Sequence, residues 1–167
     1  MKILVSDDVS VKGVELLRKH GYEVDVKKNL DEAGLVACIG EYDGLITRSM
    51  THVTEKVIDA AKKLKVVGRA GVGVDSIDIK KATERGIVVV NTPTANTMAA
   101  TEHTCAMIMA ITRHIPQAHN SLMAGEWDRS RFTGIQLKDK TIGIIGVGRI
   151  GSRIAKRMQA MEMKTIG

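Results

Sequence analysis

The sequence predicts an α/β protein with two parts: a parallel sheet wrapped by helices, followed by the beginning of a second α/β unit. Two patterns indicate this. Over about the first ninety residues, short apolar runs alternate with amphipathic helical segments, and parallel strands require such crossover connections. After residue 140, a new apolar run leads into a glycine-rich turn and another amphipathic segment. The first part is therefore expected to have a flavodoxin-like, doubly wound arrangement.

Five strands are expected in the first part, each a short run rich in aliphatic residues. They are Ile3–Val5, Tyr22–Val26, Gly44–Thr47, Lys65–Val67 and Ile87–Val90. Between them, apolar residues recur at helical spacing. Thr54 and Asp75 are the expected N-caps of two helices, and Gly21 and Gly86 the expected stops, because short polar side chains cap helix starts and glycine ends helices.

The chain changes character after Asn91-Thr-Pro93. Residues 98–115 form an expected helix that is apolar on most sides, and such a helix must be buried in a core or against a partner. Residues 116–138 are polar and are expected to form a loop anchored by Trp127 and Phe132.

The composition disfavours several classes of protein. Aromatic residues make up only 2% of the chain, which argues against a nucleic-acid module that stacks bases. No apolar run approaches the length that a bilayer requires, and Cys38 and Cys105 show neither a disulfide framework nor metal-ligand spacing. The start MKILVSDD is typical of a strand rather than a signal peptide. We therefore expect a cytoplasmic protein with no metal, membrane or nucleic-acid partner.

The net charge of +6 is concentrated near the end of the chain. Residues 1–137 carry 18 Lys and Arg against 17 Asp and Glu, a balance of +1, whereas residues 138–167 carry 7 against 2, a balance of +5. Arg153, Lys156 and Arg157 fit a solvated helix face. Arg149 alone is placed to reach a phosphate.

The expected strand Thr141–Ile145 leads into Gly146-Val-Gly148-Arg-Ile-Gly151 and then into a helix. Dinucleotide binding requires this strand–GxGxxG–helix context. Gly146 allows a tight turn, Gly148 has no side chain to block a pyrophosphate, and Gly151 lets helix and strand pack closely. The helix N-terminus offers N–H groups to phosphates. The second part is therefore expected to be the beginning of a Rossmann dinucleotide-binding domain.

The acidic residue that binds the ribose hydroxyl in such domains should follow the next expected strand, Met163–Ile166, and the chain ends at Gly167. The motif therefore leaves NAD and NADP open. A two-stranded piece also cannot cover its own sheet faces. We expect the chain to be a natural, engineered or proteolytic piece of a longer protein.

Six motifs spread over the chain occur together in one family. They are Ile46-Thr-Arg-Ser49, Gly68-Arg-Ala-Gly-Val-Gly-Val-Asp75, Asn91-Thr-Pro93 with Asn96, Glu102-His-Thr104, Gly125-Glu-Trp127 and Gly146-Val-Gly-Arg-Ile-Gly151. This set resembles the D-isomer-specific 2-hydroxyacid dehydrogenase family, and within it the D-3-phosphoglycerate dehydrogenases. The resemblance implies NAD-dependent oxidation of D-3-phosphoglycerate to 3-phosphohydroxypyruvate, a reaction of serine biosynthesis, by the intact protein.

The resemblance also implies a domain organisation. Residues 1–97 would form a substrate-binding domain and residues 98–167 the N-terminal part of the NAD-binding domain. A homodimer would form through the helix 98–115 and the cofactor domain, which would bury that apolar helix.

Physical reasoning and the resemblance both place a site at strand ends. Arg48 follows the third expected strand and Arg69 the fourth, and two guanidinium groups at adjacent strand ends suit a phosphate. Gly71-Val72-Gly73 can present successive backbone N–H groups to a carboxylate. By resemblance, the substrate-binding residues are Arg48, Arg69, Val72, Gly73 and Asn96, and the cofactor-binding residues are Val72, Gly146, Gly148, Arg149, Ile150 and Gly151.

The resemblance implies further that the catalytic groups, a histidine base, the carboxylate that orients it and an arginine, lie beyond residue 167. None of the histidines in this chain falls in the family's catalytic motif, so none is expected to be catalytic, and the chain alone is expected to be inactive. They are His20, His52, His103, His114 and His119.

Three other functions stay open or are disfavoured. The pair Asp7-Asp8 after the first strand suggests a phospho-accepting receiver domain. That chemistry requires an aspartate at the end of the third strand, where this chain has Thr47-Arg48. A non-catalytic NAD-binding, dimerising relative stays open. Within the enzymes, reduction of hydroxypyruvate, glyoxylate or D-lactate also stays open.

Overall fold

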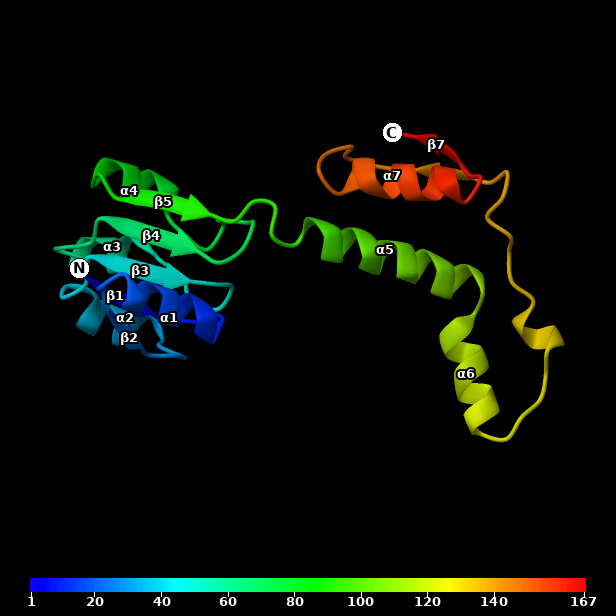
Figure 1. The fold of residues 1–167 in the computed structure, drawn as a ribbon, viewed down its shortest axis with the longest axis horizontal. Helices are drawn as coiled ribbons and strands as arrows, with labels where there is room; N and C mark the ends of the chain where they lie inside the picture. Colours follow the sequence, from blue (N-terminus) through cyan, green and yellow to red (C-terminus); the bar gives the residue numbers. More distant parts are fainter. The chain divides into compact units, whose positions relative to one another are not determined.

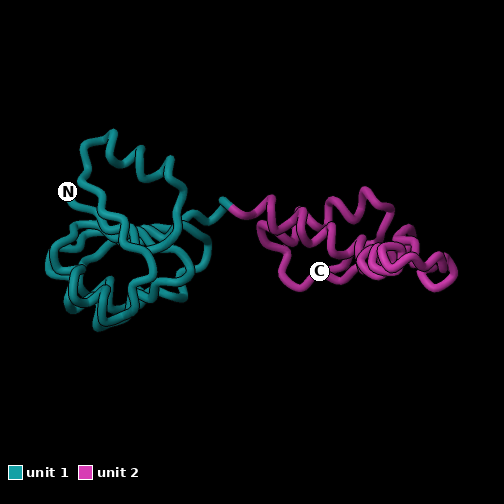
Figure 2. The backbone as a smooth tube through the Cα atoms, turned by 90° about the horizontal axis from the view of Figure 1, so that it is seen from below, with its two compact units in different colours: residues 1–95 teal, residues 96–167 magenta.

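The computed structural model describes residues 1–167, which divide into two compact units, Met1–Ala95 and Asn96–Gly167 (Figure 2). Each unit has its own sheet and its own buried residues. They are described one at a time.

The first unit is built on a five-stranded parallel sheet (Figure 1). Its strands are β1 (Lys2–Val5), β2 (Glu23–Val26), β3 (Gly44–Thr47), β4 (Val66–Arg69) and β5 (Val88–Asn91). They lie in the order β2-β1-β3-β4-β5, with every neighbouring pair parallel. This is the strand order of flavodoxin-like folds, so the predicted fold class is confirmed.

Helices cover the two faces of this sheet unequally. They are α1 (Val11–Lys19), α2 (Glu32–Ile39), α3 (Glu55–Ala60) and α4 (Ile79–Glu84). The larger core joins Leu4, Leu45 and Val67 of the strands to residues of α2, α3 and α4. A smaller core on the other face joins Ile3 and Val5 to Val14 of α1. Successive strand residues therefore point to opposite faces, as a parallel sheet buried between helices requires.

The predicted helix stops are correct, because Gly21 and Gly86 both adopt positive φ just after α1 and α4. Thr54 is the N-cap of α3, although its hydroxyl donates to Glu32 rather than accepting from a backbone N–H. The predicted N-cap Asp75 is wrong: α4 starts three residues later, and its cap is Asp78.

The late start of α4 has a tertiary cause. The N–H of Val53 donates to the carbonyl of Ser76 at 2.8 Å, and the N–H of Asp78 donates to the carbonyl of Val53 at 2.9 Å. Residues 76–78 are therefore held in a bridge to the segment before α3. The Asp78 side chain then accepts from the N–H of Lys81 at 2.9 Å, which begins the helix.

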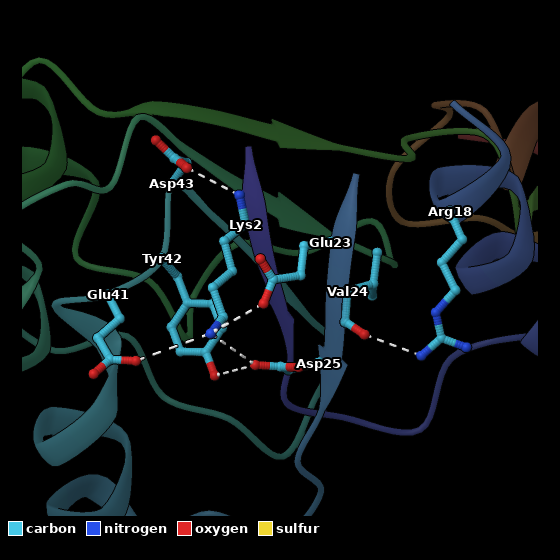
Figure 3. Close-up of polar contacts among 8 residues, drawn as sticks. All are labelled: Lys2, Arg18, Glu23, Val24, Asp25, Glu41, Tyr42 and Asp43. Carbon is cyan, nitrogen blue, oxygen red and sulfur yellow. Dashed lines mark hydrogen bonds and ion pairs between the residues drawn. The ribbon is translucent and has the colours of Figure 1, made fainter. Parts of the chain in front are cut away.

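A polar cluster beside β1 and β2 surrounds Tyr42, whose side chain is fully buried (Figure 3). Its hydroxyl donates to Asp25 at 2.8 Å, and the ammonium of Lys2 lies 3.4 Å from the same carboxylate and 5.2 Å from the tyrosine ring. The tyrosine hydrogen bond, and then Lys2, lower the pKa of Asp25. Burial, and then the bond to Asp25, raise the pKa of Tyr42. The cluster fixes the loop before β3 to the strand at the edge of the sheet.

The second unit combines three helices with a two-stranded sheet (Figure 1). Its elements are α5 (Thr97–Thr112), α6 (Ile115–Met123), a short 3-10 helix (Ser130–Phe132), β6 (Thr141–Gly143), α7 (Gly151–Ala160) and β7 (Lys164–Ile166). The strands β6 and β7 are parallel neighbours, as predicted. The buried centre of this unit is formed by Leu137, Ile154 and Met158, with α5 packed against α7.

The prediction of a loop over residues 116–138 is wrong in its first part, because α6 occupies Ile115–Met123. Its Pro116 lies in the first turn, where the missing N–H has no helical partner to lose. His114, with φ +52°, separates α6 from α5. The sequence did not indicate this helix because a proline stands at its start and its middle positions, Gln117, His119, Asn120 and Ser121, are polar.

The helix predicted to be buried, α5, has several apolar residues that no other part of the chain covers. On α5, Met98, Met107 and Ile111 are exposed, and Ile111 is 67% exposed. The expected anchor Trp127 is 75% exposed, beside a cavity of about 280 Å³ that Phe132 and Leu122 also line. None of the helices is both long enough and apolar enough to cross a membrane.

Candidate functional site

The carboxyl ends of four neighbouring strands bring polar residues to one edge of the first unit. Thr47 at the end of β3 pairs with Arg69 at the end of β4, and Arg69 pairs with Asn91 at the end of β5. Arg48 directly follows Thr47, and Asp7 follows β1. Ligands of doubly wound sheets bind outside this edge. The structure therefore brings the predicted residues Arg48 and Arg69 to adjacent strand ends.

The guanidinium of Arg48 is exposed and has no carboxylate partner. Its one hydrogen bond within the chain is a long one, 3.4 Å, from Nη1 to the carbonyl of Asp8. The Asp8 carboxylate is instead 2.5 Å from the ammonium of Lys28, which lowers its pKa, with a smaller contribution from Arg48. The charge of Arg48 is therefore available to an anion.

A buried carboxylate beneath Arg48 fixes its backbone. Asp7 is only 5% exposed, and its Oδ2 accepts from the N–H groups of Arg48 and, at 3.2 Å, of Thr51. The Thr51 hydroxyl lies 3.0 Å from Asp7 Oδ1 and 2.9 Å from the Ser6 hydroxyl. Sequence reasoning missed the role of this group, although an aspartate two residues after the end of the first strand was the available signal. Its role is to hold the β3–α3 loop that carries Arg48.

Arg69 is half-buried and folds back over the turn that follows it. A Cβ atom at Gly71 would lie 2.5 Å from Arg69 Nη1 and 3.2 Å from Cζ. Nε of Arg69 is buried and has no hydrogen-bond partner. A guanidinium without a carboxylate or a carbonyl partner beside an exposed turn is a candidate for anion binding.

The turn after Arg69 presents two of the three backbone N–H groups that were predicted to form an anion nest. The N–H of Gly71 is used within the chain, donating to the carbonyl of Arg69 at 2.8 Å. The N–H groups of Val72 and Gly73 donate to no protein atom, and both residues are exposed. Two adjacent free N–H groups match the two oxygens of a carboxylate.

In the second unit, the glycines of the GxGxxG turn differ in their surroundings. Gly146 has φ +91°, which a side chain would disfavour. A Cβ atom at Gly151 would lie 2.2 Å from the carbonyl oxygen of Gly146, so α7 and the turn touch through this glycine. A Cβ atom at Gly148 would meet nothing within 4 Å. Gly148 thus faces open space, where a ligand could approach the backbone.

The N-terminus of α7 has the features of a phosphate site. The N–H groups of Arg149, Ile150 and Gly151 donate to no protein atom, whereas that of Ser152 already donates to Gly148. Arg149 is exposed. A cavity of about 560 Å³ opens beside Gly146, lined by residues of β6, β7 and the turn. Free N–H groups and the positive end of a helix dipole favour phosphates.

Asn96 is the first residue of the second unit and the N-cap of α5. Its carbonyl accepts from the N–H of Ala100 at 2.9 Å, and its side chain makes no capping hydrogen bond. Its part in a substrate site, and a site shared by Val72 and the glycine turn of the second unit, stay predictions.

Comparison with known proteins agrees with this geometry. The family model of the D-isomer specific 2-hydroxyacid dehydrogenase catalytic domain matches residues 3–164. The chain therefore belongs to the D-isomer specific 2-hydroxyacid dehydrogenase family.

Similar proteins include both sequences and solved structures. The chain is 48% identical to the D-3-phosphoglycerate dehydrogenase of Archaeoglobus fulgidus over 166 residues, which cover 99% of the chain and 32% of that protein. The crystal structure of the TT0316 protein of Thermus thermophilus matches with a TM-score of 0.91 at 34% identity, covering 99% of this chain and 55% of that one. NAD+-bound 3-phosphoglycerate dehydrogenase of Entamoeba histolytica matches with a TM-score of 0.78 at 31% identity, covering 99% and 52%.

The chain spans about a third of the length of the curated relatives it matches. The matching third contains both the strand-end arginines and the glycine-rich turn.

Proposed function

We propose that this chain supplies the substrate-binding groups and the first part of the cofactor site of an NAD-dependent dehydrogenase that oxidises D-3-phosphoglycerate to 3-phosphohydroxypyruvate in serine biosynthesis. The observation that carries the proposal is the pair of guanidinium groups at adjacent strand ends, Arg48 and Arg69, neither of which has a carboxylate partner. Two such groups beside free backbone N–H groups suit a substrate with a phosphate at one end and a carboxylate at the other.

The residues take distinct parts in this proposal. Arg48 and Arg69 bind the substrate phosphate, and the N–H groups of Val72 and Gly73 bind the carboxylate. The family resemblance assigns Asn96, the first residue of the second unit, to the substrate as well. The substrate-binding domain corresponds to residues 1–97, close to the first compact unit, and the N-terminal part of the cofactor domain to residues 98–167.

The GxGxxG turn fits a dinucleotide. We assign the pyrophosphate to Gly148, which leaves room for it, and to the free N–H groups of Arg149, Ile150 and Gly151. Gly146 shapes the turn, and the family resemblance assigns Val72 to the cofactor as well. NAD, when bound, accepts a hydride from the substrate. The NAD+ in the Entamoeba relative supports NAD as the cofactor of this chain.

We also propose a homodimer that covers the exposed apolar residues of the second unit. Met107 and Ile111 are exposed and lie four residues apart on α5, and Leu122 and Met123 at the end of α6 and Trp127 after it are exposed as well. A second copy of the chain offers the same surface, as a two-fold dimer requires. Burial of such a surface would stabilise the dimer.

The phosphate assignment is testable on the 167-residue chain by NMR titration of backbone N–H signals with D-3-phosphoglycerate. We expect shifts at Arg48, Arg69, Val72 and Gly73. Arg48→Ala and Arg69→Ala should each weaken binding about tenfold or more, because a hydrogen bond to a charged group is worth about 1.5–3 kcal/mol. Arg85→Ala is the matched control, because Arg85 lies before β5 and pairs with Asp59.

Two results would contradict the assignment. One is a set of shifts that avoids the strand ends of β3 and β4. The other is an equal loss of affinity in Arg85→Ala, which would show that net charge rather than position governs binding.

A further inference from the structure

We propose that Asn91 and Thr92, at the end of β5, set the direction of the N–H groups that bind the substrate carboxylate. They are positioning residues, which act through the turn rather than by touching the substrate. The inference rests on the proposed function, because it concerns the Val72 and Gly73 N–H groups assigned there.

The evidence is a set of hydrogen bonds to two successive carbonyls of the turn. The Nδ2 atom of Asn91 donates to the carbonyl oxygen of Val72 at 2.7 Å. The N–H of Thr92 donates to the carbonyl oxygen of Gly71 at 3.0 Å, and its hydroxyl lies 3.3 Å from the same oxygen. Two neighbouring residues at the end of β5 thus hold two neighbouring peptide units of the turn after β4.

Because the peptide unit is planar, a hydrogen bond that fixes the direction of a carbonyl also fixes the direction of the N–H group in the same unit. The carbonyl of Gly71 and the N–H of Val72 belong to one planar unit, and the carbonyl of Val72 and the N–H of Gly73 belong to the next. The chain has no cis peptide bond, so each N–H points opposite to its carbonyl. Because both carbonyls face the end of β5, both N–H groups face away from it. That common direction is what two-point binding of a carboxylate requires.

The two peptide units differ in how much they need this support. Rotation of the unit between Val72 and Gly73 changes ψ of Val72 and φ of Gly73, and glycine tolerates either sign of φ. Rotation of the preceding unit changes φ of Val72, and a β-branched residue strongly disfavours positive φ. The Gly73 N–H therefore depends on Asn91, whereas the Val72 N–H is held by Thr92 and by the side chain of Val72 itself.

The inference makes Asn91 a determinant of carboxylate recognition but not of phosphate recognition. Arg48 and Arg69 act from β3 and β4 and do not hydrogen-bond to Asn91. Loss of the Asn91 amide should therefore reduce affinity only for ligands that carry a carboxylate. Thr92→Val should have a smaller effect, because the backbone N–H of residue 92 still donates to Gly71.

The test compares two ligands in the 167-residue chain by NMR titration. D-3-phosphoglycerate has a phosphate and a carboxylate, whereas glycerol 3-phosphate has a phosphate and a hydroxymethyl group in place of the carboxylate. We expect the wild-type chain to prefer D-3-phosphoglycerate. Asn91→Leu, which keeps size and adds no charge, and Asn91→Ala should lower that preference about tenfold or more, the effect of about one hydrogen bond to a charged group. Binding of glycerol 3-phosphate should not change.

Thr94→Ala is the matched control, because Thr94 is exposed in the same loop and its side chain makes no hydrogen bond. Its ligand preference should equal that of the wild-type chain. The NMR signals of both Asn91 variants should match those of the wild-type chain at all residues except 71–73 and 91. Such a match would show that the fold is intact.

The outcomes separate this inference from the proposed function. If the wild-type chain binds both ligands equally, the carboxylate site itself is wrong and the proposed function fails with it. If the wild-type chain prefers D-3-phosphoglycerate and the Asn91 variants keep that preference, the proposed function stands and the role of Asn91 is overturned. A fall in affinity for both ligands would also overturn it, because Asn91 would then be a general support of the sheet edge.

Discussion

A Cβ atom added at Gly151 would lie 2.2 Å from the carbonyl oxygen of Gly146, so the first residue of α7 touches the start of the glycine turn. Backbone atoms cannot yield as a flexible side chain can. Gly151→Ala should therefore push α7 away from β6 and destabilise the second unit by about 1–3 kcal/mol, the usual cost of overpacking. Urea unfolding followed at the signals of Ile154 and Met158 would measure this.

Gly148→Ala is the matched partner of that change, because a Cβ atom there meets nothing within 4 Å. It should leave the stability of the second unit unchanged within about 0.5 kcal/mol, the range of ordinary surface substitutions. It should, however, weaken NAD binding by placing a methyl group where we assign the pyrophosphate. NMR titration with NAD would check this. Unchanged NAD-induced shifts at residues 148–151 would refute the assignment.

Removal of the buried Asp7 carboxylate should affect both stability and the substrate site. In Asp7→Ala, the N–H groups of Arg48 and Thr51 lose their acceptor, which costs about 1–3 kcal/mol for each buried donor left unpaired. We also expect weaker binding of D-3-phosphoglycerate, because the backbone of Arg48 is no longer fixed. Asp8→Ala is the control, since Asp8 is exposed and pairs with Lys28. Equal effects in both variants would argue against a special role for Asp7.

The cluster around Tyr42 should make stability depend on pH at the acidic end. The pKa of Asp25 is lowered in the folded chain by the hydrogen bond from Tyr42 and by Lys2. Its contribution to the free energy of unfolding is therefore present above the unfolded pKa of about 3.9 and is lost as the pH falls through the lower folded pKa. Asp25→Asn should be less stable than wild type at neutral pH.

The difference between Asp25→Asn and wild type should shrink as the pH falls below the unfolded pKa of about 3.9 and through the lower folded pKa, because the carboxyl group then becomes protonated in both states. Urea unfolding at a series of pH values would measure it. Glu15→Gln serves as a control, because Glu15 is exposed on α1 and forms no ion pair. A constant difference at all pH values would show that packing, rather than the charge of Asp25, produces the effect.

The proposed dimer should depend on the exposed apolar side chains of α5. Ile111→Glu would place a carboxylate in the buried interface, and an unpaired buried charge costs several kcal/mol, so dimerisation should weaken by about tenfold or more. Analytical ultracentrifugation over a range of concentrations would show this. Leu16→Glu is the control, because Leu16 is similarly exposed but lies on α1 in the first unit. A wild-type chain that stays monomeric would refute the dimer.

The sequence by itself determined the features that depend on local chemistry. The period of the apolar residues located the strands and most of the helices, because a strand buried on both faces reads as a continuous apolar run. Gly21 and Gly86 marked helix ends, since glycine readily adopts positive φ. The strand–turn–helix context of Gly146–Gly151 and the order of the motifs also predicted the family to which the chain belongs.

Only the tertiary structure decided the features that depend on segments distant in sequence. The bridge from Val53 to residues 76–78 places the N-cap of α4 at Asp78 rather than at the predicted Asp75. The hydrogen bonds of Asp7 to Arg48, and of Asn91 to Val72, join residues 41 and 19 positions apart. The local sequence around each residue does not predict such contacts. The contacts form only when separate strands end at the same edge of a sheet. The arginines could therefore be predicted, but the groups that hold their loops and orient the turn could not.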